Sequence, residues 1–215
     1  MKRFLVVVGG LLACWAVVAG VEERLEARQL LEAFFTEQGG WEQAIAALPS
    51  DIEDQMRICI ACHGEGGNSP NREIPSLAGQ NPPYFVEQML VYQRAARYPE
   101  MMHLLSEQME REGILAAALY FAIQPRRVMG EVDHQKGQQG AALYRAYCIH
   151  CHGEDGSGAN PGYANLRGQR ADYLSISMRR FRDRSERRVS HEMAVATLGL
   201  SDQQIEELAH YLAGQ

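Results

Sequence analysis

The pattern of hydrophobic and polar positions along the chain predicts helices and gives no convincing strand. Helices are expected in residues 84–96, where two prolines precede the run, and in residues 136–147. Residues 64–83, which precede the first of these helices, are dense in Gly, Pro, Asn and Ser, and this composition predicts a long loop without regular structure. The predicted fold class is all-α. Since the loop is long and irregular, it is expected to wrap around another part of the folded structure.

Two capping boxes mark expected helix starts. Ser50 with Glu53 predicts a helix that runs from Asp51 into the first pair of cysteines, and Ser201 with Gln204 predicts the closing helix of the chain. In the closing helix, three apolar residues recur at the spacing of one buried face: Ile205, Leu208 and Leu212.

Residues 4–21 form an uncharged run after the basic pair Lys2 and Arg3, which is the pattern of an export signal. The run exceeds the usual core of a cleaved signal peptide and just reaches the length that spans a bilayer. A retained membrane anchor is favoured over a signal peptide cleaved after Ala19, because the chain continues at once into a helical pattern without a spacer of small residues. Lipidation at Cys14 is a third interpretation, and burial of this thiol in the bilayer as a small hydrophobe is the simplest one. In each case the rest of the chain is exported.

The acidic segment 22–50 carries an amphipathic helical pattern that ends at the glycine pair 39–40. Its apolar stripe consists of Leu25, Leu30, Leu31, Phe34 and Phe35. Packing of this stripe against the chain's own first domain is the expected arrangement, and docking to a larger membrane complex is the alternative.

The chain contains an internal repeat. Residues of the first half recur 89 positions later, as Cys59 does at Cys148, and 91 positions later towards the end of each half, as Tyr120 does at Tyr211. An insertion of two residues near the arginine-rich segment 179–188 explains the change of offset. The repeat predicts two small domains, residues 51–132 and residues 133–215, after an N-terminal signal or anchor (residues 1–21) and the acidic extension (residues 22–50).

Each half contains two cysteines three positions apart with a histidine directly after the second, which is the signature of covalent haem attachment. The motifs are Cys59, Cys62 and His63 in the first half and Cys148, Cys151 and His152 in the second. Thiols at this spacing share one helix face, where they can bond the two vinyl groups of one haem while the imidazole takes an axial position on the iron. Two other interpretations fit the motifs less well. A structural zinc site would need four ligands, from two pairs of residues around one ion, and a redox dithiol would not need the histidine. The motifs predict two covalently bound haem c groups, with the Nδ1 proton of each histidine donated to a backbone carbonyl.

The sixth iron ligand is predicted from the repeat. Met102 and Met193 each stand 18 residues before a matched tyrosine, whereas Met101 falls on Glu192. A thioether ligand in both halves gives a saturated iron that is suited to electron transfer. Two nearby histidines compete for this position but have no histidine counterpart in the other half: His103 and His191. Three further methionines are expected to pack in the cores: Met89, Met109 and Met178.

Composition and charge narrow the range of functions. The chain has 46% hydrophobic and 22% charged residues, as an ordinary globular protein does, and its net charge of −6 argues against nucleic acid as a partner. A run of arginines near Asp183 and Glu186 is expected to form a solvated helix face with local ion pairs, or else to dock an acidic partner or the haem propionates. Its members are Arg179, Arg180, Arg182, Arg184, Arg187 and Arg188.

These residues resemble the dihaem class I cytochromes c, specifically the cytochrome c-four type, over roughly residues 51–215. The likeness is carried by the two haem motifs with Gly-Glu after them, segment 75–80, Tyr84, the surroundings of Met102 and Met193, and segments 200–202 and 209–211. The resemblance implies two tandem class I cytochrome c domains, each wrapped around one haem ligated by histidine and methionine. In the second half, Ala164 replaces the proline whose carbonyl the family uses to hold the axial histidine, although a backbone carbonyl survives the exchange.

The resemblance also implies that the protein carries electrons on the periplasmic side of a bacterial membrane and performs no bond-making chemistry. It would feed a terminal haem-copper oxidase, or accept electrons from a dehydrogenase or a quinol-oxidising complex, as a carrier or as a tethered subunit. Residues 4–21 would hold it to the inner membrane if retained, and it would be soluble in the periplasm if residues 1–19 are cleaved. The rival function is that of a dihaem peroxidase, which needs an open sixth position and is disfavoured by two methionine ligands.

Overall fold

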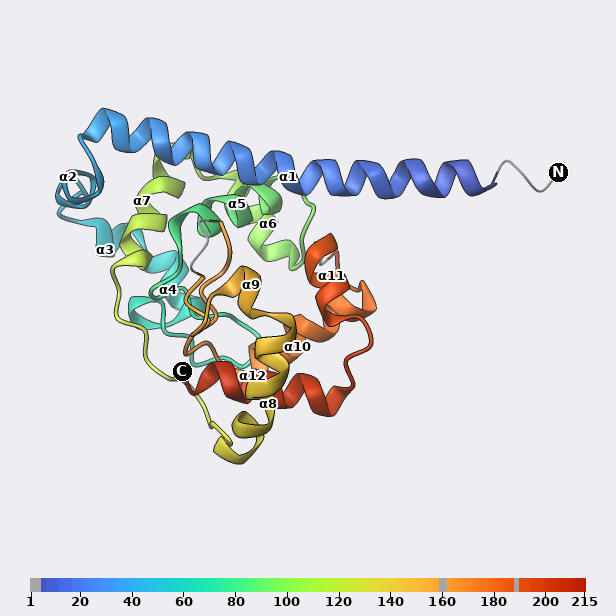
Figure 1. Cartoon of the computed structure of the whole chain (residues 1–215). Helices are drawn as coiled ribbons and strands as arrows, with labels where there is room; N and C mark the ends of the chain where they lie inside the picture. Colours follow the sequence, from blue (N-terminus) through green and yellow to red (C-terminus); the bar gives the residue numbers. More distant parts are fainter. Residues whose placement is uncertain (1–4, 159–161, 188–189) are drawn as a thin grey trace.

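The computed structural model describes residues 5–158, 162–187 and 190–215, and for residues 5–21 it describes the backbone alone. In this part of the chain the fold is all-α, as predicted, and contains no strand (Figure 1). The α-helices are α1 (Leu5–Gln38), α2 (Trp41–Ala46), α3 (Ile52–Gln55), α4 (Arg57–His63), α5 (Pro82–Gln93), α6 (Glu100–Glu107), α7 (Arg111–Ala122), α8 (His134–Tyr147), α9 (Ile149–His152), α10 (Ala171–Asp183), α11 (His191–Thr197) and α12 (Asp202–Ala213). The predicted long loop contains one turn of 3₁₀ helix, Glu65–Gly67, and is otherwise irregular.

The first half has a hydrophobic core made by α1, α5 and α7. From α5 and α7 the core takes Val86, Ile114 and Phe121, which are almost completely buried, and α1 adds Ala27 and Leu31. Helix α5 begins at the predicted prolines and ends at Gln93, a little before the expected residue 96.

The apolar stripe of the acidic extension packs on this core, as expected. Leu31 is buried, and three more stripe residues lie against the same cluster: Leu30, Phe34 and Phe35. The helix ends just before the predicted glycine break, where Gly39 and Gly40 both have positive φ. Leu25 was wrongly included in the stripe, because its side chain is 53% exposed and lies away from the core.

The second half has a separate core in which α8 crosses α12. Gly140 permits this close crossing, since a Cβ there would lie 2.1 Å from the backbone oxygen of Glu207. Helix α8 contains the predicted residues 136–147, and α12 begins with the predicted capping box of Ser201 and Gln204. Its expected apolar face is buried: Ile205, Leu208 and Leu212.

The predicted capping box of Ser50 and Glu53 does not form. Asp51 is the residue that precedes α3, and no side chain caps that helix start. The expected continuous helix is instead divided at Met56 into the four-residue α3 and the separate α4. A capping motif is only a local preference, and the long helix α1 already covers the first core in this half.

Backbone hydrogen bonds confirm the internal repeat together with its change of offset. The amide of Leu77 donates to Gly67 O, and its counterpart Leu166 donates to Gly156 O, both at 2.7 Å. Gly79 donates to Phe121 O at 2.8 Å, and its counterpart Gly168 donates to Leu212 O at 2.9 Å. In this pair of bonds the two donors are 89 positions apart and the two acceptors are 91 positions apart, as an insertion of two residues between them requires.

The two halves meet through polar side chains that bind backbone carbonyls of the opposite half. Arg126 donates from Nη1 to the oxygens of Asn165 and Arg167 at 3.0 and 2.9 Å. Asn81 donates from Nδ2 to three carbonyl oxygens of the second half, those of Ser157, Gly158 and Tyr163. The contact therefore depends on the backbone conformation of the segments whose carbonyls these side chains bind.

Helix α1 contacts both halves (Figure 1). The guanidinium of Arg24 lies 3.3 Å from the carboxylate of Glu87 in α5 and 3.7 Å from that of Glu192 in α11. It also stacks over the ring of Tyr163, 5.1 Å from the ring centroid. Burial raises the pKa of Glu87, although the charge of Arg24 opposes this shift. The acidic extension is therefore held to the second half as well as to the first.

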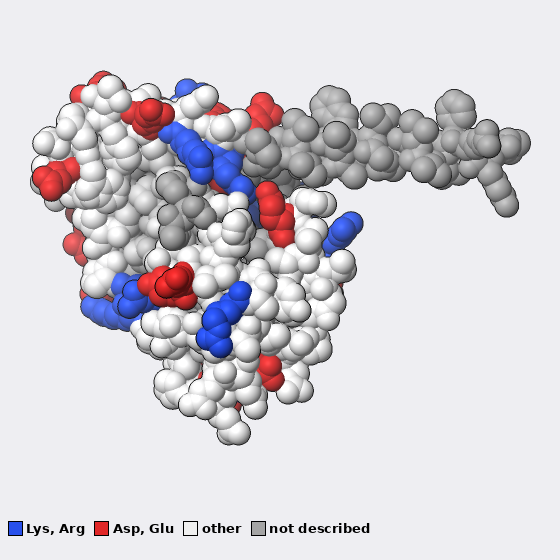
Figure 2. Space-filling view, viewed as in Figure 1, with Lys and Arg blue, Asp and Glu red and all other residues white. Residues whose placement is uncertain are grey.

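Part of the arginine run forms the expected local ion pairs: Arg180 pairs with Glu186 at 2.6 Å and Arg182 with Asp183 at 2.8 Å. Arg187 instead pairs with Glu100 of the first half at 3.0 Å. Figure 2 shows acidic and basic side chains interspersed over one face of the molecule, without a large field of one sign. Arg188 lies outside the described residues.

The N-terminal segment is helical from Leu5 and continues without a break into the acidic extension. Among the described residues, no helix has the length and apolar character needed to cross a membrane. The side chains of the expected signal or anchor, residues 1–21, and with them Cys14, lie outside the described part of the chain.

Candidate haem sites

Each predicted haem motif lies on a short helix that ends directly after its histidine. Helix α4 contains the whole first motif, whereas in the second motif Cys148 immediately precedes α9. The glycines that follow, Gly64 and Gly153, have matching conformations with φ of 79°. At Gly64 a Cβ would lie 2.0 Å from Asn68 O, so no other residue fits where the chain turns from the helix into the loop.

The two histidines lie in equivalent environments. His63 donates from Nδ1 to the backbone oxygen of Pro75 at 2.8 Å, and His152 donates from Nδ1 to the oxygen of Ala164 at 3.1 Å. A carbonyl oxygen can only accept, so in each ring Nδ1 carries the proton and Nε2 is left as the electron-pair donor. The predicted bond to a backbone carbonyl is confirmed in both halves, including the half where alanine replaces proline.

Burial keeps both imidazoles neutral. Each histidine side chain is only 7% exposed. Burial lowers the pKa of His63 and of His152, and the hydrogen bond to the carbonyl opposes this shift only in part. A neutral ring with a fixed tautomer is the form that ligates a metal.

Burial affects the first cysteine of each motif. Cys59, Cys62, Cys148 and Cys151 form no disulfide among the described residues. Burial raises the pKa of Cys59, and it raises the pKa of Cys148 to about 12. At the first cysteine of each motif, burial therefore disfavours the thiolate form.

The chemistry of the donor set fits haem. In each motif a buried neutral imidazole can supply one iron ligand, and two cysteines three positions apart can supply two points of attachment for one haem. In the described residues, no group of three or more Cys, His, Asp or Glu side chains is arranged to hold a metal ion.

The two predicted methionine ligands occupy the same position on equivalent short helices. Met102 is the third residue of α6 and Met193 is the third residue of α11. Both side chains are half-buried, and Met102 packs against the core that Cys59 also contacts. Met193 belongs to no described core cluster; its amide is capped by the hydroxyl of Ser190 at 3.2 Å. Met101 is 60% exposed, which agrees with its exclusion as a ligand.

The competing candidates have other roles or positions. His103 donates from Nδ1 to Tyr92 O at 2.9 Å, but its Nε2 lies 3.6 Å from the carboxylate of Glu107, and His191 is exposed. Met89 and Met178 are buried in the first and second core, as predicted, and Met109 packs against the first.

Arg97 is a buried residue beside the first site that the sequence patterns did not single out. It is 8% exposed, hydrogen-bonds Gln88 and lies with its guanidinium 4.8 Å from the centroid of the Tyr92 ring. It also bonds the hydroxyl of Tyr173 in the second half at 3.1 Å. Its Nε has no hydrogen-bond partner among the described residues. A buried guanidinium near His63 with an unpaired Nε fits a carboxylate such as a haem propionate. The signal available in the sequence was its counterpart Arg188, 91 positions later.

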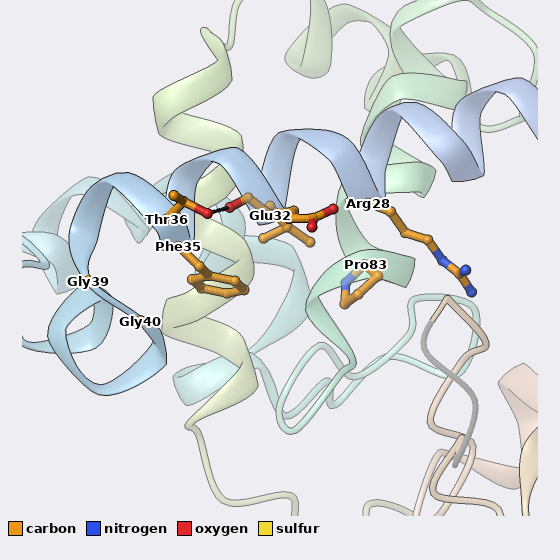
Figure 3. Close-up of a pocket in the computed structure, with 8 residues that line it drawn as sticks. Arg28, Glu32, Phe35, Thr36, Gly39, Gly40 and Pro83 are labelled. Atoms are coloured by element: carbon orange, nitrogen blue, oxygen red, sulfur yellow. Dashed lines mark hydrogen bonds between the residues drawn. The ribbon is translucent and has the colours of Figure 1, made fainter.

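A surface pocket lies apart from these residues, between the end of α1 and the start of α5 (Figure 3). Arg28, Glu32 and Phe35 line it on one side and Pro83 on the other, and Thr36 bonds the backbone oxygen of Glu32 at 2.7 Å. It contains none of the predicted haem ligands.

Comparisons with known proteins agree with this geometry. Two helical halves, each with a Cys-x-x-Cys-His motif and an anchored histidine, define a dihaem c-type cytochrome, and the Cytochrome c family model matches residues 137–215. The chain is 34% identical over 169 residues to a cytochrome c4 of Thiocapsa roseopersicina, covering 73% of this chain and 86% of that one. It is 27% identical over 179 residues to a thiosulfate dehydrogenase electron acceptor of Thiomonas intermedia (strain K12), covering 73% of this chain and 78% of that one.

The crystal structure of reduced cytochrome c4 from Pseudomonas stutzeri superimposes with a TM-score of 0.69 at 27% identity, covering 76% of this chain and 96% of that one. The chain belongs to the cytochrome c4 family of dihaem class I cytochromes. As a member it carries covalently bound haem c and transfers electrons.

Proposed function

We propose that two sets of residues in this chain hold the two haem groups. Each haem is bound by two thioether bonds, one axial histidine and one axial methionine: Cys59, Cys62, His63 and Met102 in the first half, and Cys148, Cys151, His152 and Met193 in the second. The single observation that carries this proposal is the matched anchoring of His63 and His152 on backbone carbonyls, which fixes both Nε2 atoms as donors.

The haem irons, when bound, supply reversible one-electron oxidation and reduction. The protein's residues hold and shield them. The carbonyls of Pro75 and Ala164 fix the ring orientations of the two histidines. The guanidinium of Arg97 would bind a carboxylate of the first haem, and α6 and α11 would supply Met102 and Met193 as the second protein ligands. With both axial positions filled by side chains, the sites favour electron transfer over substrate binding, and nothing in them favours the peroxidase alternative.

The protein acts on the periplasmic side of the membrane, and residues 1–21 direct its export. It relays electrons from a dehydrogenase or a quinol-oxidising complex towards a haem-copper oxidase. A dehydrogenase donor is supported by the relative named as the electron acceptor of thiosulfate dehydrogenase. Purification from native membranes tests these statements: identification of bound subunits tests the redox partner, and N-terminal sequencing tests whether residues 1–21 are retained. A mature chain that begins at residue 20 and copurifies with no redox enzyme would indicate a free carrier without an anchor.

The ligand set is tested by near-infrared magnetic circular dichroism of the oxidised holoprotein, which reports the sulfur-to-iron charge-transfer signal. Met102→Leu and Met193→Leu should each remove about half of that signal, because each methionine ligates one of two irons. Met101→Leu is the matched control and should leave the signal intact. A wild-type protein without the signal, or a loss caused by the Met101 variant, would refute the assignment.

A further inference from the structure

Two glutamines at matched positions of the repeat cross the contact between the halves. Gln169 donates from Nε2 to the backbone oxygen of Ser76 at 2.9 Å and accepts at Oε1 from the amide of Ser76 at 2.9 Å. Gln80 makes the same pair of bonds with the backbone of Asn165, at 3.1 and 2.7 Å. Ser76 and Asn165 are themselves repeat counterparts, so the two pairs are related by the approximate symmetry of the halves.

The peptide unit that each glutamine binds is the one that anchors a histidine. The peptide between Pro75 and Ser76 accepts at its carbonyl from His63 Nδ1 and donates from its N–H to Gln169. In the second half, the peptide between Ala164 and Asn165 accepts from His152 Nδ1 and donates to Gln80. Each histidine is therefore connected, through a single peptide unit, to a glutamine of the opposite half.

Burial makes these contacts hard for water to replace. Ser76 is 1% exposed, Gln169 is 3% exposed and Gln80 is 7% exposed. A peptide whose N–H donates a hydrogen bond carries more negative charge on its carbonyl oxygen, and chains of such bonds strengthen one another inside a protein. Loss of the glutamine would leave a buried N–H without a partner and a weaker acceptor for the histidine.

We propose that Gln169 and Gln80 are positioning residues that act across the contact between the halves, each tuning the axial histidine of the opposite half. The stronger the bond from Nδ1, the more basic Nε2 becomes toward iron. A more basic ligand favours the ferric over the ferrous state, so each glutamine lowers the reduction potential of the haem in the other half. This inference rests on the proposed function, since it takes His63 and His152 as iron ligands.

The test uses Gln169→Met and Gln80→Met in the full-length holoprotein, with each haem's reduction followed by NMR. Gln169→Met should raise the equilibrium constant for reduction of the first haem by a factor of about three to ten, where tenfold corresponds to about 59 mV for one electron. The reduction potential of the second haem should change much less. Gln80→Met should show the reverse pattern.

The control variant is Asn81→Ala, which removes side-chain bonds across the same contact but none to either histidine-anchoring peptide. The direction of the shift in reduction potential distinguishes loss of the glutamine hydrogen bond from looser packing of the contact. Looser packing admits water, which stabilises the more charged ferric haem and lowers its potential, whereas loss of the glutamine bond raises it. A lowered potential, equal shifts in both haems or an equal effect of Asn81→Ala would overturn the proposal.

A measurement on the wild-type holoprotein keeps the proposal testable if the variants do not fold. The Ser76 amide and the His63 Nδ1 proton should both exchange with solvent far more slowly than exposed groups. Fast exchange of the Ser76 amide would refute the link through the peptide. If instead the wild type carries two haems with histidine and methionine ligands but Gln169→Met leaves the first potential unchanged, the inference fails while the proposed function stands.

Discussion

At the scale of single residues, the glycine after each proposed axial histidine determines where its helix ends. Gly64 combines a φ of 79° with a position where a Cβ would lie 2.0 Å from Asn68 O. Gly199 has a similar φ of 83° but faces open space, with nothing within 4 Å of a Cβ. The two positions therefore separate the cost of backbone conformation from the cost of a steric clash.

We expect Gly199→Ala to cost about 1–2 kcal/mol of unfolding free energy, because only the left-handed backbone conformation opposes it. Gly64→Ala should cost a further 1–3 kcal/mol or so, because the added methyl group overlaps a backbone oxygen. Urea unfolding of both holoproteins measures the difference. Equal costs at the two positions would show that the loop after the first motif can move aside.

At the scale of elements, α1 is the part of the fold that departs most from a simple duplication. In the second half α8 crosses the closing helix at Gly140, but the counterpart of that glycine in the first half is Asp51. Before its haem motif, the first half has the short helices α2 and α3 instead of one long helix. Helix α1 covers the first core with Ala27 and Leu31. The acidic extension is thus an integral part of the first half.

Leu31→Ala should destabilise the holoprotein by about 2–4 kcal/mol, because it leaves a cavity where α1 meets the core. Leu25→Ala is the matched control on the same helix and should change stability by less than about 0.5 kcal/mol, since that side chain is exposed. Thermal unfolding followed by circular dichroism checks both values. If the Leu31 variant were as stable as the Leu25 variant, α1 would not be docked in solution.

At the scale of the whole molecule, the halves are joined by charged and amide side chains on backbone carbonyls. Arg126 is the clearest case, because it donates to Ala78 O at 2.6 Å as well as to two carbonyls of the second half. Burial without an acidic partner lowers the pKa of Arg126 to about 10. Its hydrogen bonds hold the two loops that anchor the histidines in a fixed relation.

Arg126→Met should lower the unfolding free energy by about 1–3 kcal/mol, because it leaves carbonyls at the contact without their donor. The adjacent Arg127 is exposed, so Arg127→Met should have an effect within about 0.5 kcal/mol. Calorimetry of the holoproteins provides the comparison, and it should also show a broader transition for the Arg126 variant as the halves unfold less cooperatively. Indistinguishable melting curves would contradict this role.

Local patterns predicted much of the fold. The capping box at Ser201, the glycine break after α1 and the offset between Tyr120 and Tyr211 are encoded within short stretches or in direct repetition, and all are present. The box at Ser50 failed although its residues match the motif equally well, because surrounding packing decides whether a local preference is realised. The anchoring of both histidines was predicted correctly, while the haem ligands themselves stay a proposal.

The sequence by itself determined the helical class, the duplication and the two haem motifs, and it predicts Met102 rather than Met101 as a ligand, because each depends on spacing along the chain. Only the tertiary structure decided which side chains cross between the halves. The pairing of Gln169 with Ser76 joins residues 93 positions apart, and Arg97 meets Tyr173 over 76 positions. No local pattern encodes such contacts, since they exist only once two separately built cores have docked in one orientation.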